Sequence, residues 1–272
     1  MRRAILLLLS SLPIFVVSCN SIELERRHLV VSGSPSFAPM IRDIADRFQA
    51  LHPGVRVDIA TNPVDRMIGE TREGLVDVAL VGRALRSDDG LRGVEIARDG
   101  MAFIVHPSNT VPALDEHQLV GLLTRAYTDW NDVGGVSGRV VVVGVADGRA
   151  LRTSLLQRFQ LASANVPLDQ PLYHNAQVID AVSHNPRALG YVSLAAVGST
   201  QSIRLLPQRG VDATTENVRS GRYPYARPIV VATRTQANEL AASFLEFAQS
   251  AEVRDLIERH GFVSTLPEES PP

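Results

Sequence analysis

Residues 28–54 read HLVVSGSPSFAPMIRDIADRFQALHPG, and they contain the pattern that decides the fold. A short apolar run ends at Gly33, as the run of a buried strand does. A turn rich in serine and proline follows, and apolar residues then return with helical spacing at Ile41, Ile44, Ala45, Phe48 and Leu51. His52-Pro53-Gly54 ends this helix, because proline and glycine lie just beyond its last turn. The stretch therefore predicts a strand, a turn and an amphipathic helix.

The same alternation of strands and helices continues along the rest of the chain. Further strands are predicted over 55–60, 76–81, 101–106, 140–145, 188–192, 203–206 and 229–232. Further helices are predicted over 65–73, 115–123, 148–159, 176–183, 236–249 and 251–260. Because strands that alternate with helices form mostly parallel sheets flanked by helices, the sequence predicts an α/β protein.

The N-terminal residues have the three-part layout of an export signal. Two arginines supply positive charge, an apolar run covers 4–17, and the only cysteine of the chain, Cys19, follows directly after Ser18. This ending resembles a bacterial lipobox, in which the cysteine is acylated and the chain is cut just before it. We therefore expect a signal peptide at 1–18, a tether at 19–27, and acyl chains on Cys19 that anchor the protein to a lipid bilayer. An ordinary signal peptide with an incidental cysteine is the alternative.

The composition argues against several classes of function. The 272 residues carry a net charge of −2, which gives no reason to expect a nucleic-acid partner. The seven histidines are scattered without metal-binding spacing, so we expect neither a metal nor another cofactor. We find no nucleophile elbow and no nucleotide-binding loop, and an exported hydrolase would need a serine, a histidine and an acid that the sequence does not identify. We therefore expect that the protein is not an enzyme.

The loop before the first long helix has the composition of an anion site. Gly33-Ser34-Pro35-Ser36 lies between a predicted strand and a predicted helix, so free backbone N–H groups and two hydroxyls gather at the helix N-terminus. Such an arrangement attracts an anion without any charged side chain. The alternative is that Ser34 or Ser36 is a plain helix cap, which contributes about 1 kcal/mol to stability.

Several stretches together resemble one known family, in their order and spacing rather than singly. They are 33–39 with the helix to 54, 76–85, 97–102, 109–135, 188–193, 223–228 and 243–264. In this order they resemble the phosphate-binding protein of the bacterial phosphate ABC importer, in its short lipoprotein form. The resemblance covers nearly the whole chain after the leader.

The resemblance implies a two-lobed clamshell of the type II periplasmic-binding fold, each lobe a mostly parallel sheet flanked by helices. It places lobe 1 at 28–105 plus 226–264 and lobe 2 at 106–225, with chain crossings near His106-Pro107 and near 222–228. We expect a disordered tail at 265–272.

Function is implied by the same resemblance. A monomer held at the cell envelope, facing the periplasm or the cell exterior, would bind phosphate or another small oxyanion in the cleft between its lobes. It would close by hinge motion and hand the solute to an ABC permease in the inner membrane.

The positions that bind the anion in the resembled family are only partly kept. Lobe 1 retains Ser34, Ser36 and the backbone amides of Ser36 and Phe37, but Pro35 replaces a serine or threonine and supplies no donor. Gly82 followed by Arg83 stands where the family has serine, or serine and aspartate.

Lobe 2 departs further from the family. The stretch Arg-Glu-x-Gly-Ser-Gly-Thr-Arg is replaced over 145–152 by VADGRALR, which keeps Gly148 and Arg152. Val145 takes the place of an arginine, and Arg149 and Leu151 take the places of a serine and a threonine. Each lost charge-assisted hydrogen bond would cost about 1.5–3 kcal/mol of binding free energy.

Two interpretations of these changes stay open. Arg83, Arg149 and Arg152 could bind an oxyanion bidentately in place of the lost hydroxyls. Alternatively they are surface arginines, and the protein is a sensor or interaction module of the same fold that no longer binds phosphate. The first interpretation predicts ligand contacts from Ser34, Ser36, Phe37, Arg83, Arg149 and Arg152.

Overall fold

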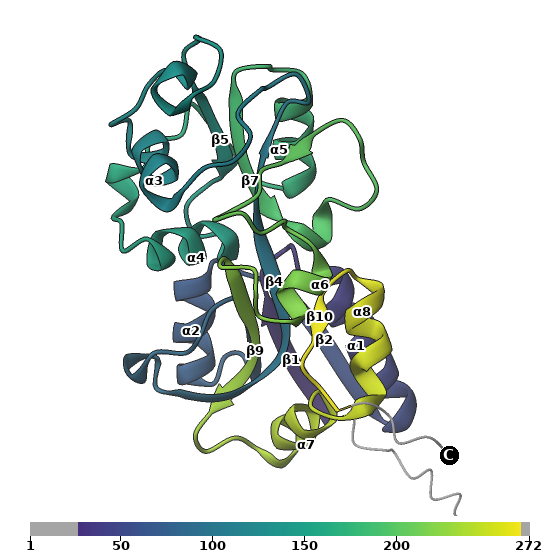
Figure 1. Cartoon of the computed structure of the whole chain (residues 1–272). Coiled ribbons are helices and arrows are strands. Elements are labelled where there is room, and N and C mark those ends of the chain that lie inside the picture. The colour runs from purple at the N-terminus through teal and green to yellow at the C-terminus, as the bar shows by residue number, and fades with distance from the viewer. Residues whose placement is uncertain (1–26, 268–272) are drawn as a thin grey trace, which may run out of the picture.

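The computed structural model describes residues 27–267, which form two lobes joined by long strands (Figure 1). The first lobe holds β1 (Arg27–Gly33), α1 (Ala38–Leu51), β2 (Val55–Thr61), α2 (Val64–Glu73), β3 (Val78–Val81), α7 (Glu239–Phe247), α8 (Arg254–Arg259) and β10 (Val263–Ser264). The second lobe holds α3 (Glu116–Thr124), β5 (Val141–Val145), α4 (Ala150–Arg158), β6 (Gln170–Leu172), α5 (Asn175–Ser183), β7 (Ala188–Ser193) and β8 (Arg204–Leu205). Strands β4 (Leu91–Val105) and β9 (Ala226–Arg234) and the short helix α6 (Thr215–Arg219) lie where the lobes meet.

One mixed sheet runs through both lobes in the order β2-β1-β3-β9-β4-β7-β5-β6. β1 pairs in parallel with β2 and β3, and β5 pairs in parallel with β6 and β7. β9 pairs antiparallel with β3 and β4, and β7, β8 and β10 each pair antiparallel with β4. The α/β class and the two-lobed architecture predicted from the sequence are thus confirmed.

Each lobe has a hydrophobic core of its own, and β4 contributes to both. Ile96 and Ala97 belong to the core of the first lobe, whereas Met101 and the residues that follow it to Val105 belong to the core of the second. The pairing changes at the same point, because β4 pairs with β9 as far as Gly100 and with β7 from Met101 onward. The chain therefore crosses between the lobes before His106, near which the resemblance placed the crossing.

The first half of β4 was missed because its sequence, LRGVEIARDG over 91–100, mixes charged residues and glycine with apolar ones. The strand is half exposed there and needs no continuous apolar run. The elements β6 and α6 were missed because three and five residues are too few to show a periodic spacing of apolar residues.

Helix α1 buries the apolar face predicted for it, with one exception. Ile41, Ile44, Ala45 and Phe48 are buried, but Leu51 at the helix end is 53% exposed. At the C-terminus, the chain is ordered slightly beyond the expected boundary at 264. The Thr265 amide donates to the Ile96 carbonyl, and Leu266 is buried.

The part of the chain described, 27–267, contains no helix that is both long and apolar enough to cross a membrane. The predicted signal peptide, the predicted lipidation site Cys19 and almost all of the predicted tether lie outside the described residues, as does the end of the tail from 268.

Candidate ligand-binding pocket

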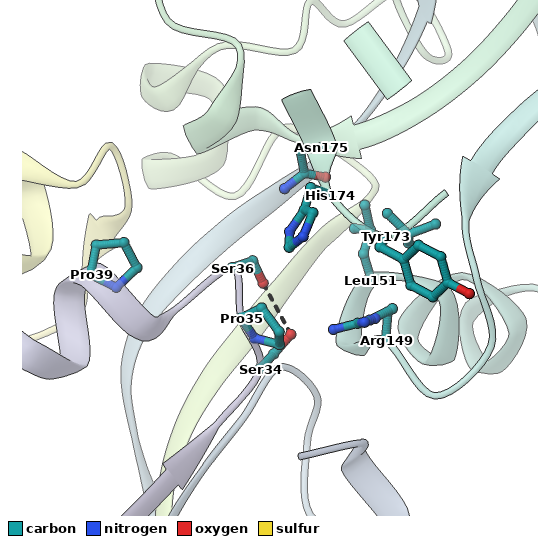
Figure 2. Close-up of a pocket in the computed structure, with 10 residues that line it drawn as sticks. Ser34, Pro35, Ser36, Pro39, Arg149, Leu151, Tyr173, His174 and Asn175 are labelled. Atoms are coloured by element: carbon teal, nitrogen blue, oxygen red, sulfur yellow. Dashed lines mark hydrogen bonds between the residues drawn. The ribbon is translucent and has the colours of Figure 1, made fainter. Parts of the chain in front are cut away.

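A pocket of about 250 Å³ lies between the lobes, where the loop before α1 faces the N-terminal ends of α4 and α5 (Figure 2). The first lobe contributes the β1–α1 loop and the first turn of α1, and the second contributes the end of β5 and the two helix starts. The lining residues are Ser34, Pro35, Ser36, Pro39, Val145, Arg149, Leu151, Tyr173, His174 and Asn175.

Helices α1, α4 and α5 begin at this pocket, directly after Phe37, Arg149 and His174. A helix N-terminus carries unpaired N–H groups and a partial positive charge. Among the described residues that line the pocket, Arg149 is a cation and none is a carboxylate. The local field therefore favours an anion.

Ser34 and Ser36 present their hydroxyls to the pocket and cap no helix. Phe37 is the N-cap of α1 and no side chain caps it, so the plain-cap alternative is wrong for both serines. Ser34 is only 4% exposed, and the Ser36 hydroxyl donates to the Ser34 hydroxyl oxygen at 3.2 Å. Both hydroxyls are thus held together at one side of the pocket (Figure 2).

Phe37 has a structural part in the same loop. Its amide donates to the Ser34 carbonyl at 2.8 Å, which closes the turn before α1. Its ring is fully buried, packs edge-on against Phe262 and lies 5.4 Å below the guanidinium of Arg227. Phe37 therefore positions the serines but does not line the pocket.

Arg149 is the arginine that the structure brings to the serines. It precedes the first turn of α4, and its guanidinium carbon lies 5.4 Å from the centre of the Tyr173 ring. No carboxylate within residues 27–267 forms an ion pair with Arg149, so its N–H donors remain available toward the pocket. Figure 2 shows the guanidinium directed toward the side where Ser34 and Ser36 lie.

Arg152 is engaged elsewhere, in the packing of α4 against the loop that follows it. It is 3% exposed, and it donates to Asp147 Oδ1 at 3.0 Å and to the Val166 carbonyl at 2.7 Å. Hydrogen bonds from Ser163 and Arg152 hold the pKa of the Asp147 carboxyl below its usual value. The sequence predicted that Arg149 and Arg152 both contact the ligand. The structure places Arg149 at the pocket and Arg152 in the packing of α4.

Arg83 is likewise held by a carboxylate of its own. It is 4% exposed and bidentate to Asp89, with N–O distances of 2.7 and 2.8 Å. Burial would raise the pKa of the Asp89 carboxyl, but hydrogen bonds from Arg83 and from the Arg86 amide outweigh burial and lower it. Arg83 and Asp147 line a separate groove of about 800 Å³, not the pocket of the serines.

An apolar wall completes the pocket. Val145 and Leu151 are each 4% exposed, and Pro35 and Pro39 lie on the facing lobe. The end of β5 is fixed because the Tyr191 hydroxyl donates to the Val145 carbonyl at 3.0 Å. Burial raises the pKa of Tyr191 to about 12, so this hydroxyl stays protonated and keeps donating.

Sequence reasoning missed Tyr173, His174 and Asn175 as lining residues. They follow β6, which pairs in parallel with β5. Residues after neighbouring parallel strands lie at the same edge of a sheet, so recognition of the short strand β6 would have placed them beside residues 146–149.

The two lobes touch directly beside the pocket. The Ser154 hydroxyl on α4 donates to the Gly82 carbonyl at 2.7 Å, and the Val64 amide donates to the Gly148 carbonyl at 3.2 Å. Ala150, the first residue of α4, is 2% exposed and packs into the core of the first lobe. Contacts across the cleft thus bring Arg149 close to the serines.

Comparison with known proteins gives a consistent picture. A family model described as a PBP superfamily domain matches residues 21–252. The phosphate-binding protein PstS of Bacillus subtilis is 21% identical over 241 residues, which cover 86% of this chain and 80% of that protein.

Solved structures agree with this relationship. An ABC-type phosphate transport receptor from Vibrio cholerae superposes with a TM-score of 0.80 at 26% identity, over 86% of this chain and 99% of its own. A putative phosphate ABC transporter substrate-binding protein from Clostridium perfringens, solved with bound phosphate, gives a TM-score of 0.76 at 27% identity. The match covers 88% of this chain and 100% of that one.

Proposed function

Because this chain belongs to the PBP superfamily, we propose that it is the solute-binding protein of an ABC importer and takes phosphate or a related oxyanion in the pocket between its lobes. The observation that carries the proposal is that Ser34, Ser36 and Arg149 line one pocket. No carboxylate among the described residues forms an ion pair with Arg149. The names of the relatives support it, since the proteins from Bacillus, Vibrio and Clostridium are described as phosphate-binding or phosphate-transport proteins.

The proposal includes a place for the protein in the cell. Export by the leader and acylation at Cys19 would tether the lobes to the membrane surface, where a permease can receive the solute. The protein would act as a monomer and would deliver its ligand unchanged, without catalysis. Ser34, Ser36 and Arg149 are the proposed ligand contacts, and Phe37, Arg83 and Arg152 support the loop and helix around them.

Replacement of Arg149 by alanine is expected to remove most of the stabilisation that phosphate gives. A ligand at 100 times its dissociation constant stabilises a protein by about 2.7 kcal/mol, which raises the unfolding midpoint by several degrees. Loss of the charged donor costs about 1.5–3 kcal/mol of binding free energy. The measurement is thermal unfolding of the mature protein, purified in detergent, with and without 10 mM phosphate. The probe is phosphate itself.

The matched control is Arg92→Ala, which removes an exposed arginine of β4 that lines none of the pockets described above. This variant should keep the full shift. If phosphate shifts neither the original protein nor the control, the proposed oxyanion site is wrong. An undiminished shift in Arg149→Ala would instead remove Arg149 from the site.

The pocket is also expected to discriminate weakly between phosphate and sulfate. The two anions differ near neutral pH in the proton that phosphate carries, and a carboxylate is the group best suited to accept it. The described lining contains no carboxylate, so the dissociation constants should agree within about tenfold, or about 1.4 kcal/mol. Titration calorimetry at pH 7 measures both, and a preference for phosphate of more than about a hundredfold would contradict this account.

A further inference from the structure

The lining of the pocket combines polar side chains from both lobes with an apolar wall. The polar side chains are those of Ser34 and Ser36 on the first lobe and of Arg149, His174 and Asn175 on the second, whereas Leu151 and the Tyr173 ring form an apolar wall (Figure 2). Pro35, Pro39 and Val145 add further lining without any side-chain donor. An anion in this pocket therefore meets polar groups from both lobes and hydrocarbon at the apolar wall.

Inorganic phosphate makes no use of the apolar wall of this pocket. Its four oxygens point to the corners of a tetrahedron, and an oxygen that faces the apolar wall loses water without gaining a donor. The pocket is also larger than the ion requires. About 250 Å³ corresponds to about eight waters at their share of liquid volume, about 30 Å³ each, whereas phosphate has five heavy atoms.

Resting on the proposed function, we infer that the physiological ligand is an organic phosphoryl compound, a phosphonate or phosphate monoester whose apolar substituent lies against Val145, Leu151 and Tyr173. Such a ligand keeps three phosphoryl oxygens for the serines, Arg149 and the amides at the start of α4. It turns its fourth substituent to the apolar wall. The charged head group then meets the polar side chains, and the substituent meets hydrocarbon.

Leu151 and Tyr173 are the residues that favour a ligand with an apolar substituent. Leu151 is 4% exposed and stands where the resembled family has a threonine, so a donor has been exchanged for hydrocarbon at the wall itself. Tyr173 is 60% exposed although Arg149 stacks on its ring, which leaves aromatic surface at the pocket for a substituent to cover.

The test compares three ligands that share one phosphoryl head group. Titration calorimetry of the mature protein with phosphate, methylphosphonate and phenylphosphonate should give dissociation constants that fall in that order. Burial of the phenyl ring should make phenylphosphonate tighter than phosphate by about tenfold or more. Phosphate binding as tightly as phenylphosphonate would overturn this inference and leave the proposed function standing. Absence of binding by all three would overturn both.

A variant of the wall provides the second arm of the same test. Leu151→Thr restores a hydroxyl there, and it should strengthen phosphate binding while it weakens phenylphosphonate binding. Leu75→Thr, at a leucine that is 68% exposed and outside the pocket, is the matched control and should change neither constant. An unchanged ratio of the two constants in Leu151→Thr would also overturn the inference.

Discussion

Arg227→Met is expected to lower the free energy of unfolding by about 3–5 kcal/mol. Arg227 on β9 and Asp99 on β4 are 5% and 2% exposed, and the Arg227 Nη2 atom lies 2.7 Å from the Asp99 carboxylate. Removal of the cation leaves a buried, unpaired negative charge that water cannot reach. Denaturant unfolding of the mature protein at pH 7 measures the loss.

The position of this ion pair explains why the effect should be large. Asp99 and Arg227 are register partners in the β4–β9 ladder, close to the point where both strands pass between the lobes. Arg227 also covers the ring of Phe37, which holds the turn of the proposed ligand site. The pair thus supports the junction of the lobes and the serine loop together.

Two controls separate the buried charge from simple loss of an arginine. Arg98→Met removes an exposed partner of Glu95 and should cost less than about 1 kcal/mol. The double variant Arg227→Met with Asp99→Leu removes both charges and should recover most of the lost stability, because an apolar pair can replace a buried ion pair. A loss below about 1 kcal/mol in Arg227→Met alone would contradict this view of the junction.

The fold could be predicted from the sequence wherever apolar spacing is local and regular. The strand and helix within 28–54 appear in the structure almost as expected, because each buries one face that the spacing reveals. The first half of β4 could not be predicted, since its pairing with β9 joins residues far apart in the chain and leaves charged side chains exposed.

The candidate site was predictable only in part, for a related reason. The loop of Ser34 and Ser36 follows from a local pattern, but the partner of an arginine does not. The Arg83 guanidinium forms an ion pair with Asp89 and does not line the pocket, whereas Arg149 does. Asp89 lies close in sequence to Arg83, and a nearby carboxylate is the signal that would have warned of this pairing.

Gly82→Val is expected to weaken binding of the phosphonate and phosphate probes by about a thousandfold, or about 4 kcal/mol. A Cβ atom at Gly82 would lie 2.6 Å from Arg227 Nη1, 2.9 Å from Phe37 Cζ and 3.2 Å from Ala150 Cβ. The added side chain would push α4 away from the first lobe and carry Arg149 away from the serines. Calorimetry measures the binding loss, and small-angle X-ray scattering should show an increased radius of gyration.

The contact at Gly82 also accounts for a pair of departures from the resembled family. That family has serine at the position of Gly82 and glycine at that of Ala150. In this chain the side chain at the contact is instead the methyl group of Ala150, which belongs to the second lobe. Ala150 can pack into the first lobe only because Gly82 offers no side chain, and the Ser154 hydroxyl then reaches the Gly82 carbonyl. Gly69→Val is the matched control, since a Cβ atom there meets nothing within 4 Å, and it should change neither affinity nor dimensions. If Gly82→Val kept its affinity and its radius of gyration, direct contact between the lobes would not be what holds Arg149 at the pocket.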